Sequence, residues 1–433
     1  MNNIINRLAG SVSSVAIATS MVGATGLMLA PGSALAQDGP VCTSPVRILA
    51  QPRDGLTLLE EYAAEFEELS GALFQIDYMN EGDRRVRSQA DASLIGRYNI
   101  YYVDEANLAQ FASSNWIVPL MPHYPAEYDF DDFDPGRVAT ATYDDTVWFA
   151  PIMGGGDLLV YRTDLMEAAG LEPPETLDEL FEVVAALHDP ANGIYGIGLR
   201  GQRGSGANVW RWMPYFKGMG GEWFVDGEPA MNSDAGVQAT KTYLDLFEYS
   251  APGTRTGSWD ESTGAFRAGQ IALIIESAPL AGITLDSTQS QVADRVGFAK
   301  PPAPLTGGGF AHGFAIGERA NQSDAERDCA GLWIAWATSR EQELRRLEIG
   351  QAGELNRQSI FASDLFAETF GEGLPAALTE TAEVTQVNFW QHANWPELGN
   401  HWGIILEELI TGTRDDIPAA LAELEAFAAN LSD

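Results

Sequence analysis

The stretch VRILAQPRDGLTLLEEYAAEFEELSGALFQIDY, residues 46–78, decides the fold class of this chain. It begins with the apolar run Val46–Ala50, continues with helix-forming residues over Thr57–Glu68 and returns to an apolar run at Leu73–Tyr78. A further strand is predicted at Asn99–Val103. Strands that alternate with amphipathic helices form parallel sheets, because each helix carries the chain back to the start of the next strand. The sequence therefore predicts an α/β fold.

Capping boxes mark three predicted helix starts, since a Ser or Thr followed three residues later by Glu satisfies the first turn of a helix reciprocally. The three pairs are Thr57 with Glu60, Thr176 with Glu179, and Ser323 with Glu326. In the first helix the 3.6-residue period places Tyr62 and Phe66 on one apolar face. In the third it places Cys329 on the apolar face, which predicts a buried thiol or a disulfide.

A second predicted strand region, Ile271–Ile275, is apolar throughout and is followed by the polar pair Glu276-Ser277. Ligands of open α/β sheets bind beyond the carboxyl ends of the strands. We therefore expect the loop at Glu276 to lie near a binding site.

The amino-terminal residues have the features of a secretory signal peptide. Arg7 precedes an apolar run over residues 12–30, and the small-residue site Ala34-Leu35-Ala36 predicts cleavage after Ala36. Gln37 stands where a lipoprotein would have Cys, so we predict no lipid anchor and a periplasmic location. The alternative is a retained membrane anchor, which needs a longer and more apolar run to cross roughly 30 Å of hydrocarbon.

Composition limits the partners and the number of domains. The 433 residues exceed what one hydrophobic core usually serves, so two domains are expected. The chain has 61 Asp and Glu against 25 Lys and Arg, with a net charge of -36. A nucleic-acid groove needs clustered cations, so nucleic acid is excluded as a partner.

Cys42 and Cys329 are the two cysteines of the chain. In an oxidising compartment they form either one long-range disulfide or two unpaired thiols, and the sequence leaves both alternatives open.

Motifs for enzyme chemistry are missing from the sequence. There is no Gly-x-Ser-x-Gly elbow, no His-Glu-x-x-His pair and no phosphate-binding loop, and none of the five histidines has a metal-ligand spacing. We therefore predict no cofactor, no metal and no catalytic residues. A glycosidase needs only two carboxylates roughly 5 to 9.5 Å apart, so a carbohydrate-active enzyme stays as an alternative.

Tryptophan is the residue type that points to a ligand. Four of the eleven tryptophans fall in Gly- and Pro-rich segments, namely Trp148, Trp210, Trp390 and Trp395. A sugar or sugar alcohol presents C–H faces that stack on flat rings, and hydroxyl edges that pair with Asp, Glu, Asn and Arg. The alternative for each tryptophan is that it covers the rim of a core.

Three segments carry a family resemblance: Tyr195–Gly201, Gly220–Phe224 and Ser258–Ala272. Through them the chain resembles the extracellular solute-binding proteins of ABC sugar importers, the family of maltose-binding protein. Within that family it is similar to the branch that handles mannitol, sorbitol and related polyols. Gln270-Ile271-Ala272 departs from the commoner Lys-Ala-Ala, so the preferred solute is expected to have drifted.

The resemblance implies a periplasmic-binding-protein type II fold, with two α/β lobes, a hinge that the chain crosses three times and a ligand cleft between the lobes. The crossings are expected near Phe149–Pro151, Gly308–Phe310 and Gln351–Gly353. The first lobe is then residues 37–149 and 309–352, and the second is residues 150–308 and 353–433.

The same resemblance implies the ligand-binding residues. Those expected from the first lobe are Gln51, Arg53, Asp54, Glu81 and Asp104. Those expected from the second lobe and the crossings are Gly155, Arg200, Asn208, Glu276, His312 and Arg357, together with the four tryptophans. Any of the acids can instead be a surface charge, and Arg200 or Arg357 can instead pair with a carboxylate that holds the hinge.

The implied function is capture of a sugar alcohol or sugar for an ABC importer. Its membrane permease is the partner, the chain acts as a monomer, and no reaction is catalysed. A second alternative keeps the fold but changes the solute, because Trp and carboxylates together also suit a polyamine or another cation.

Overall fold

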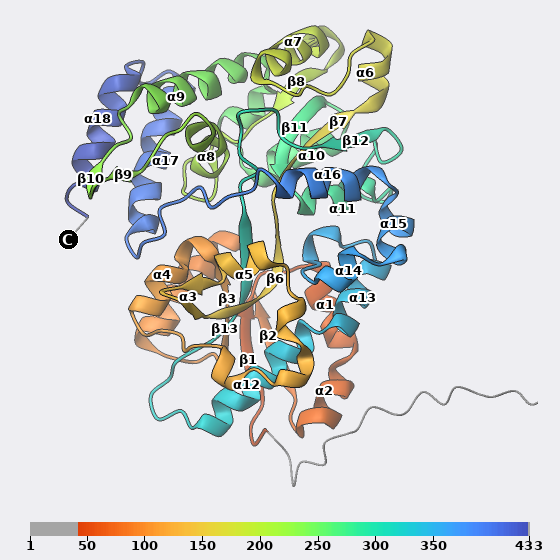
Figure 1. The fold of residues 1–433 in the computed structure, drawn as a ribbon, viewed down its shortest axis with the longest axis vertical. Coiled ribbons are helices and arrows are strands. Elements are labelled where there is room, and N and C mark those ends of the chain that lie inside the picture. The colour runs from red at the N-terminus through yellow and green to blue at the C-terminus, as the bar shows by residue number, and fades with distance from the viewer. Residues whose placement is uncertain (1–41, 432–433) are drawn as a thin grey trace, which may run out of the picture. The chain divides into compact units, whose positions relative to one another are not determined.

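A computed structural model describes residues 42–431, and the predicted signal peptide with its cleavage site lies outside these residues. The described residues form two larger sheets, each flanked by helices (Figure 1). None of the described helices is both long and apolar enough to cross a membrane.

The first sheet has five strands in the order β2-β1-β3-β13-β6. Their bounds are β1 (Val46–Ala50), β2 (Phe74–Tyr78), β3 (Ile100–Asp104), β6 (Phe149–Gly155) and β13 (Phe310–Ile316). Strand β1 pairs in parallel with both β2 and β3, which confirms the α/β prediction made from residues 46–78. Strand β13 runs antiparallel to both of its neighbours.

The second sheet has four strands in the order β12-β7-β11-β8. Their bounds are β7 (Asp157–Arg162), β8 (Tyr195–Gly198), β11 (Ile271–Ser277) and β12 (Val296–Ala299). Every residue of β11 is buried, so the prediction of a buried strand is confirmed, with the strand continuing to Ser277. Two short hairpins complete the strands, β4 (Thr142–Tyr143) with β5 (Thr146–Val147) and β9 (Phe224–Val225) with β10 (Glu228–Pro229).

Eighteen α-helices connect and cover the strands within the described residues. The first five are α1 (Asp54–Glu61), α2 (Ala63–Ser70), α3 (Glu81–Leu94), α4 (Glu105–Ser113) and α5 (Pro135–Thr140). The next six are α6 (Thr163–Ala169), α7 (Leu177–Leu187), α8 (Asn208–Gly218), α9 (Asp234–Leu246), α10 (Trp259–Arg267) and α11 (Pro279–Leu285). The last seven are α12 (Asp324–Ala337), α13 (Arg340–Glu348), α14 (Gln358–Phe361), α15 (Asp364–Phe370), α16 (Gly373–Ala382), α17 (Trp395–Thr411) and α18 (Ile417–Ala428).

Two of the three predicted capping boxes are confirmed, at the starts of α7 and α12. The box at Thr57 is wrong. Helix α1 begins three residues earlier, and the Thr57 hydroxyl donates to the Asp54 carbonyl within the helix instead of capping it. The single helix predicted over 57–68 is also interrupted, because Tyr62 leaves helical geometry and separates α1 from α2.

The strands of each sheet show where the chain passes from one sheet to the other. Strand β6 keeps residues 149–155 in the first sheet and β7 starts the second sheet at Asp157, so the first passage is at Gly156. The crossing predicted at Phe149–Pro151 therefore lies inside β6 and is too early. The return passage spans residues 300–309, between β12 and β13, and includes most of the predicted second crossing.

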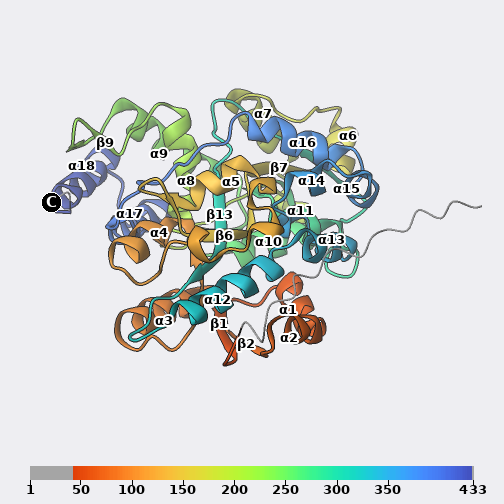
Figure 2. The same cartoon turned by 60° about the horizontal axis from the view of Figure 1, so that its bottom comes forward.

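A disulfide joins Cys42 and Cys329, with Cα atoms 5.2 Å apart, so the bonded alternative is correct. Cys329 lies on α12, which packs beside β1 and α2 (Figure 2). Both cysteines are buried in one apolar cluster with Phe66, Trp333 and Trp336. The bond thus ties the start of the first sheet to a helix 287 residues away in sequence.

Replacing both cysteines in the variant C42A/C329A should lower the free energy of unfolding by about 2–5 kcal/mol, because the bond closes a long loop in the unfolded chain. Urea unfolding of the oxidised wild type and the variant measures the difference. Wild type treated with reductant is the matched control and should resemble the variant. Equal unfolding free energies for all three samples would contradict a stabilising role.

Candidate functional site

A cavity of about 310 Å³ lies between the two sheets. This is at the lower end of the roughly 300–1,000 Å³ typical of small-ligand pockets. Residues that follow β1, β2 and β3 line one side, at 51–53, 80–81 and 104–107. These three strands are parallel, so their carboxyl ends meet at one edge of the sheet and bring the three loops together.

The opposite side comes from the second sheet and its helices. It includes Arg200 after β8, Trp210 on α8, Trp259 on α10 and Ser277 at the end of β11. Strands β6 and β13 add Met153, Phe310 and His312 between the two sides. The cavity is therefore built from segments more than 250 residues apart in sequence.

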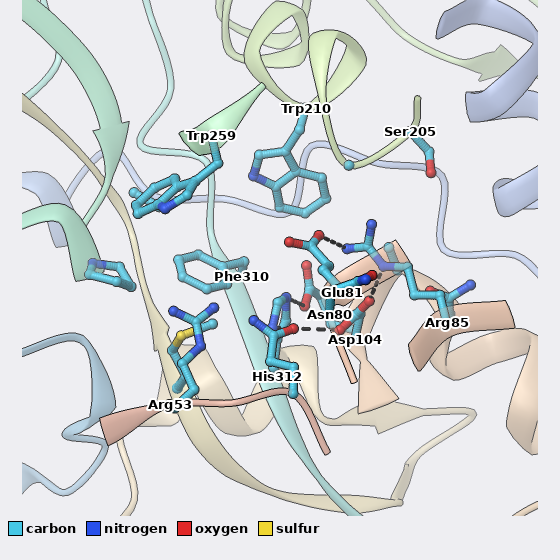
Figure 3. Close-up of a pocket in the computed structure, with 18 of the residues that line it drawn as sticks. Arg53, Asn80, Glu81, Arg85, Asp104, Ser205, Trp210, Trp259, Phe310 and His312 are labelled. Atoms are coloured by element: carbon cyan, nitrogen blue, oxygen red, sulfur yellow. Dashed lines mark hydrogen bonds and ion pairs between the residues drawn. The ribbon is translucent and has the colours of Figure 1, made fainter. Parts of the chain in front are cut away.

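Aromatic rings form one wall of the cavity. Figure 3 shows the rings of Trp210, Trp259 and Phe310 gathered around the same space. The Trp210 ring is held from behind by Phe389, with ring centroids 5.9 Å apart in a stacked arrangement. These rings and the Met153 side chain give the flat apolar surface on which C–H groups of a ligand can rest.

A carboxylate–guanidinium network faces these rings. The Arg84 Nη2 atom lies 2.6 Å from Asp104 Oδ1, and the Arg85 Nε–H donates to the other Asp104 oxygen. Arg85 also pairs with Glu81 at 2.6 Å. Burial opposes ionisation of Asp104, but Arg84 and Arg85 outweigh it and hold the pKa of that carboxyl well below its usual range. Asp104 is therefore a fixed anionic acceptor.

Glu105 and His312 adjoin this network, and burial disfavours the charged form of each. Burial, reinforced by the neighbouring Asp104 charge, raises the pKa of Glu105 well above its usual range. Burial lowers the pKa of His312 to about 4. The His312 Nδ1 atom lies 3.1 Å from the Tyr102 hydroxyl, and its Nε2 atom lies 3.6 Å from Glu105. The cavity thus offers neutral hydrogen-bonding groups next to charged ones.

On the second-sheet side, Arg200 belongs to a chain of buried ion pairs. Arg200 holds Glu276 through two contacts of 2.6 and 2.7 Å, and Arg211 lies 3.4 Å from the same carboxylate. Arg211 in turn lies 2.9 Å from Asp157. Burial raises the pKa of Asp157 to about 7 in spite of Arg211. The Arg200 guanidinium also lies over the Trp259 ring, 5.1 Å from its centroid.

Seven of the residues predicted to bind ligand line this cavity: Gln51, Arg53, Glu81, Asp104, Arg200, Trp210 and His312. Glu276 lies directly behind Arg200 and fixes its guanidinium. For Arg200 both alternatives therefore apply, since it faces the cavity and also pairs with a carboxylate.

Four predicted residues lie outside the cavity, two of them inside a core and two packed against one. Asn208 is fully buried at the start of α8 and donates to the Gly403 carbonyl at 2.9 Å, so it joins α8 to α17. Trp395 is fully buried in the second-sheet core. Trp148 donates its indole N–H to the Tyr143 carbonyl, and Trp390 stacks on His392 at 4.1 Å. These are the core alternatives considered for loop tryptophans.

Three further predicted residues also lie outside the cavity. Arg357 is buried and donates to the carbonyls of Thr338 and Asp129, so it joins segments of the chain instead of binding ligand. Asp54 is exposed at the start of α1. Gly155 ends β6 against Ala278.

The sequence prediction missed fourteen cavity residues. They are Pro52, Asn80, Arg85, Glu105, Ala106, Asn107, Met153, Ser205, Gly206, Trp259, Asp260, Ser277, Pro279 and Phe310. Half of them follow the ends of predicted strands, which was the available signal. Trp259 lay within a segment that carried the family resemblance.

No group of three His, Cys, Asp or Glu within residues 42–431 is arranged to hold a metal ion.

The low pKa of His312 predicts a specific pH dependence of stability. Between pH 4 and 6.5 His312 binds fewer protons in the folded state than in the unfolded state, so its contribution to the free energy of unfolding falls as pH falls through this window. The loss attributable to His312 is up to about 3 kcal/mol. The variant H312Q lacks the titrating imidazole, so its free energy of unfolding should fall less between pH 6.5 and pH 4.5 than that of the wild type. Urea unfolding at pH 6.5 and 4.5 measures the change in each protein, and equal changes in both would contradict the assignment.

Comparison with known proteins identifies the family. Residues 52–344 match bacterial extracellular solute-binding proteins. The mannitol-binding protein of Pseudomonas aeruginosa is 27% identical over 297 residues, which is 68% of this chain and 67% of that protein. A solute-binding protein of an ABC transporter from Agrobacterium radiobacter K84, solved in complex with ribitol, aligns with a TM-score of 0.81 and 26% identity over 91% of this chain and 100% of that one.

Maltose-bound MalE3 of T. maritima shares the fold alone, with a TM-score of 0.76 and 20% identity over 89% of this chain and 100% of that one. The two-lobed α/β architecture is therefore the periplasmic-binding-protein type II fold. The chain belongs to the bacterial extracellular solute-binding protein family.

Proposed function

We propose that this protein is the periplasmic binding component of an ABC importer and captures a small polyhydroxylated solute, a sugar alcohol or a sugar. The observation that carries the proposal is the pairing of a Trp210–Trp259–Phe310 wall with charged acceptors and donors across one cavity. C–H faces rest on the rings, while hydroxyl groups pair with Asp104, Glu81 and the guanidinium groups. The ribitol and mannitol named for its relatives are solutes of this kind.

Capture proceeds by closure of the two lobes around the solute. Each lobe supplies one side of the cavity, so a bound solute bridges them and stabilises the closed form. Gly156 and residues 300–309 are the segments that connect the sheets and absorb the movement. Micromolar affinity corresponds to about 8 kcal/mol, which stacking and several hydrogen bonds supply after ordering costs.

The membrane permease of the importer is the proposed macromolecular partner. One chain provides both sides of the cavity, so the protein acts as a monomer. The acidic composition argues against nucleic acid as a second partner.

A glycosidase with Asp104 as its nucleophile is disfavoured by the ion pairs of that carboxylate. A retaining enzyme needs a free carboxylate to attack the sugar, yet both Asp104 oxygens are engaged by Arg84 and Arg85. A polyamine site is disfavoured by the three arginines that line the cavity, Arg53, Arg85 and Arg200. Binding without reaction therefore accounts best for these groups.

A thermal-shift panel of sugar alcohols, monosaccharides, disaccharides and polyamines on the mature protein tests the proposal. A true ligand at 100 times its Kd should add about 2.7 kcal/mol to the free energy of unfolding. At least one sugar alcohol or sugar should raise the melting temperature, and it should be recovered unchanged after long incubation. Stabilisation by polyamines alone would overturn the carbohydrate proposal.

The variant W259A should then weaken the identified ligand by about 2 kcal/mol, roughly thirtyfold in Kd, because it removes a ring from the cavity wall. W390A is the matched control, since Trp390 packs on Phe224 and His392 outside the cavity. Its affinity should be unchanged in calorimetric titration.

A further inference from the structure

Arg53 differs from the other arginines that line the cavity in having no carboxylate partner. Arg85 pairs with Glu81 and Asp104, and Arg200 pairs with Glu276. Within residues 42–431, no Asp or Glu oxygen lies within 4.0 Å of Arg53. The cavity wall therefore carries one guanidinium whose charge no neighbouring side chain balances in a direct ion pair.

The one side chain that engages Arg53 is neutral. With its amide oxygen turned toward Arg53, Gln51 accepts from Nε at 3.1 Å and from Nη2 at 2.6 Å. A guanidinium has five N–H donors in a planar fork, so this contact leaves part of the fork unused. Figure 3 shows Arg53 on the opposite side of the view from Arg85 and its two carboxylates. The free donors are thus separated from the acidic side of the cavity.

Two of the acids near Arg53 form no direct ion pair with it. Glu354 is buried, and burial raises its pKa against the opposing effects of Arg53 and Arg346. Asp260, on the other side of the cavity, is exposed and so remains hydrated. Arg53 is also the N-cap of α1, whose first turn adds partial positive charge beside the Asp54 carboxylate.

We propose that the natural solute of this cavity is an aldonate, a polyhydroxylated chain with one terminal carboxylate, and that Arg53 binds the carboxylate. A carboxylate matches the planar fork of a guanidinium through two parallel hydrogen bonds. One unbalanced guanidinium also matches a single negative charge better than the two charges of a phosphate. The inference rests on the proposed function, because the remaining hydroxyl chain uses the aromatic wall and the Glu81–Asp104 side described above.

Matched pairs of solutes test the inference by isothermal titration calorimetry in 0.15 M NaCl. Ribonate with ribitol, mannonate with mannitol and gluconate with glucitol differ only in the terminal group. For at least one pair the wild type should bind the aldonate at least tenfold more tightly than the alditol. The variant R53Q should lose this preference, because it weakens the aldonate at least tenfold more than the matching alditol, and R53K should retain part of the preference.

R295Q is the control variant, because Arg295 is exposed and pairs with Asp164 and Asp294 away from the cavity. It should keep the full preference. If alditols bind and aldonates bind no better, the inference fails while the proposed function stands. If the aldonate preference persists in R53Q, Arg53 is not the carboxylate site and the inference also fails. If no member of any pair binds and no other sugar does, the proposed function itself fails, and the inference with it.

Discussion

The antiparallel pairing of β6 with β13 is the contact on which the rest of the structure depends. Both strands complete the first sheet, and each continues directly into a passage to the second sheet. The two strands approach closely because Gly313 has no side chain, since a Cβ there would lie 2.1 Å from the Phe149 ring. The same pair carries Met153, Phe310 and His312 into the cavity, so the connection between the lobes and the floor of the site are one element.

Charge compensation fixes Asp104 and Glu276 in place at the site. Buried charges are costly unless they are paired, and two buried carboxylates at the cavity follow this rule. Asp104 lies between Arg84 and Arg85, and Glu276 lies between Arg200 and Arg211. The pKa of each carboxyl is lowered, and Asp104, which lines the cavity, is suited to accept hydrogen bonds from hydroxyl groups. Arg53 differs from these groups because it has no ion-pair partner among the described residues. For that reason we assign it to a carboxylate of the solute.

The alternation of strands and helices was readable from residues 46–78, and the family resemblance led to Gln51, Glu81 and Asp104. Packing contacts between segments far apart in the chain could not be predicted from the sequence. Asn208 and Trp395 are of residue types that often bind ligands. Both are nevertheless buried, at the place where α17 packs on α8. Sequence spacing does not show that α8 and α17 pack together, since their contact at Asn208 and Gly403 joins residues 195 positions apart. The start of α1 was misplaced for a similar reason, since a capping box is a local signal that the surrounding fold overrode at Thr57.

The most direct test of the central claim is a crystal structure of the protein grown with the solute that gives the largest thermal shift. The account predicts that the solute occupies the cavity between the two sheets, with carbon atoms within about 4 Å of the Trp210 and Trp259 rings and oxygen atoms hydrogen-bonded to the Asp104 side. A solute bound elsewhere, for example in the surface hollow between Tyr195 and Gly253, with the cavity occupied by water alone, would contradict it.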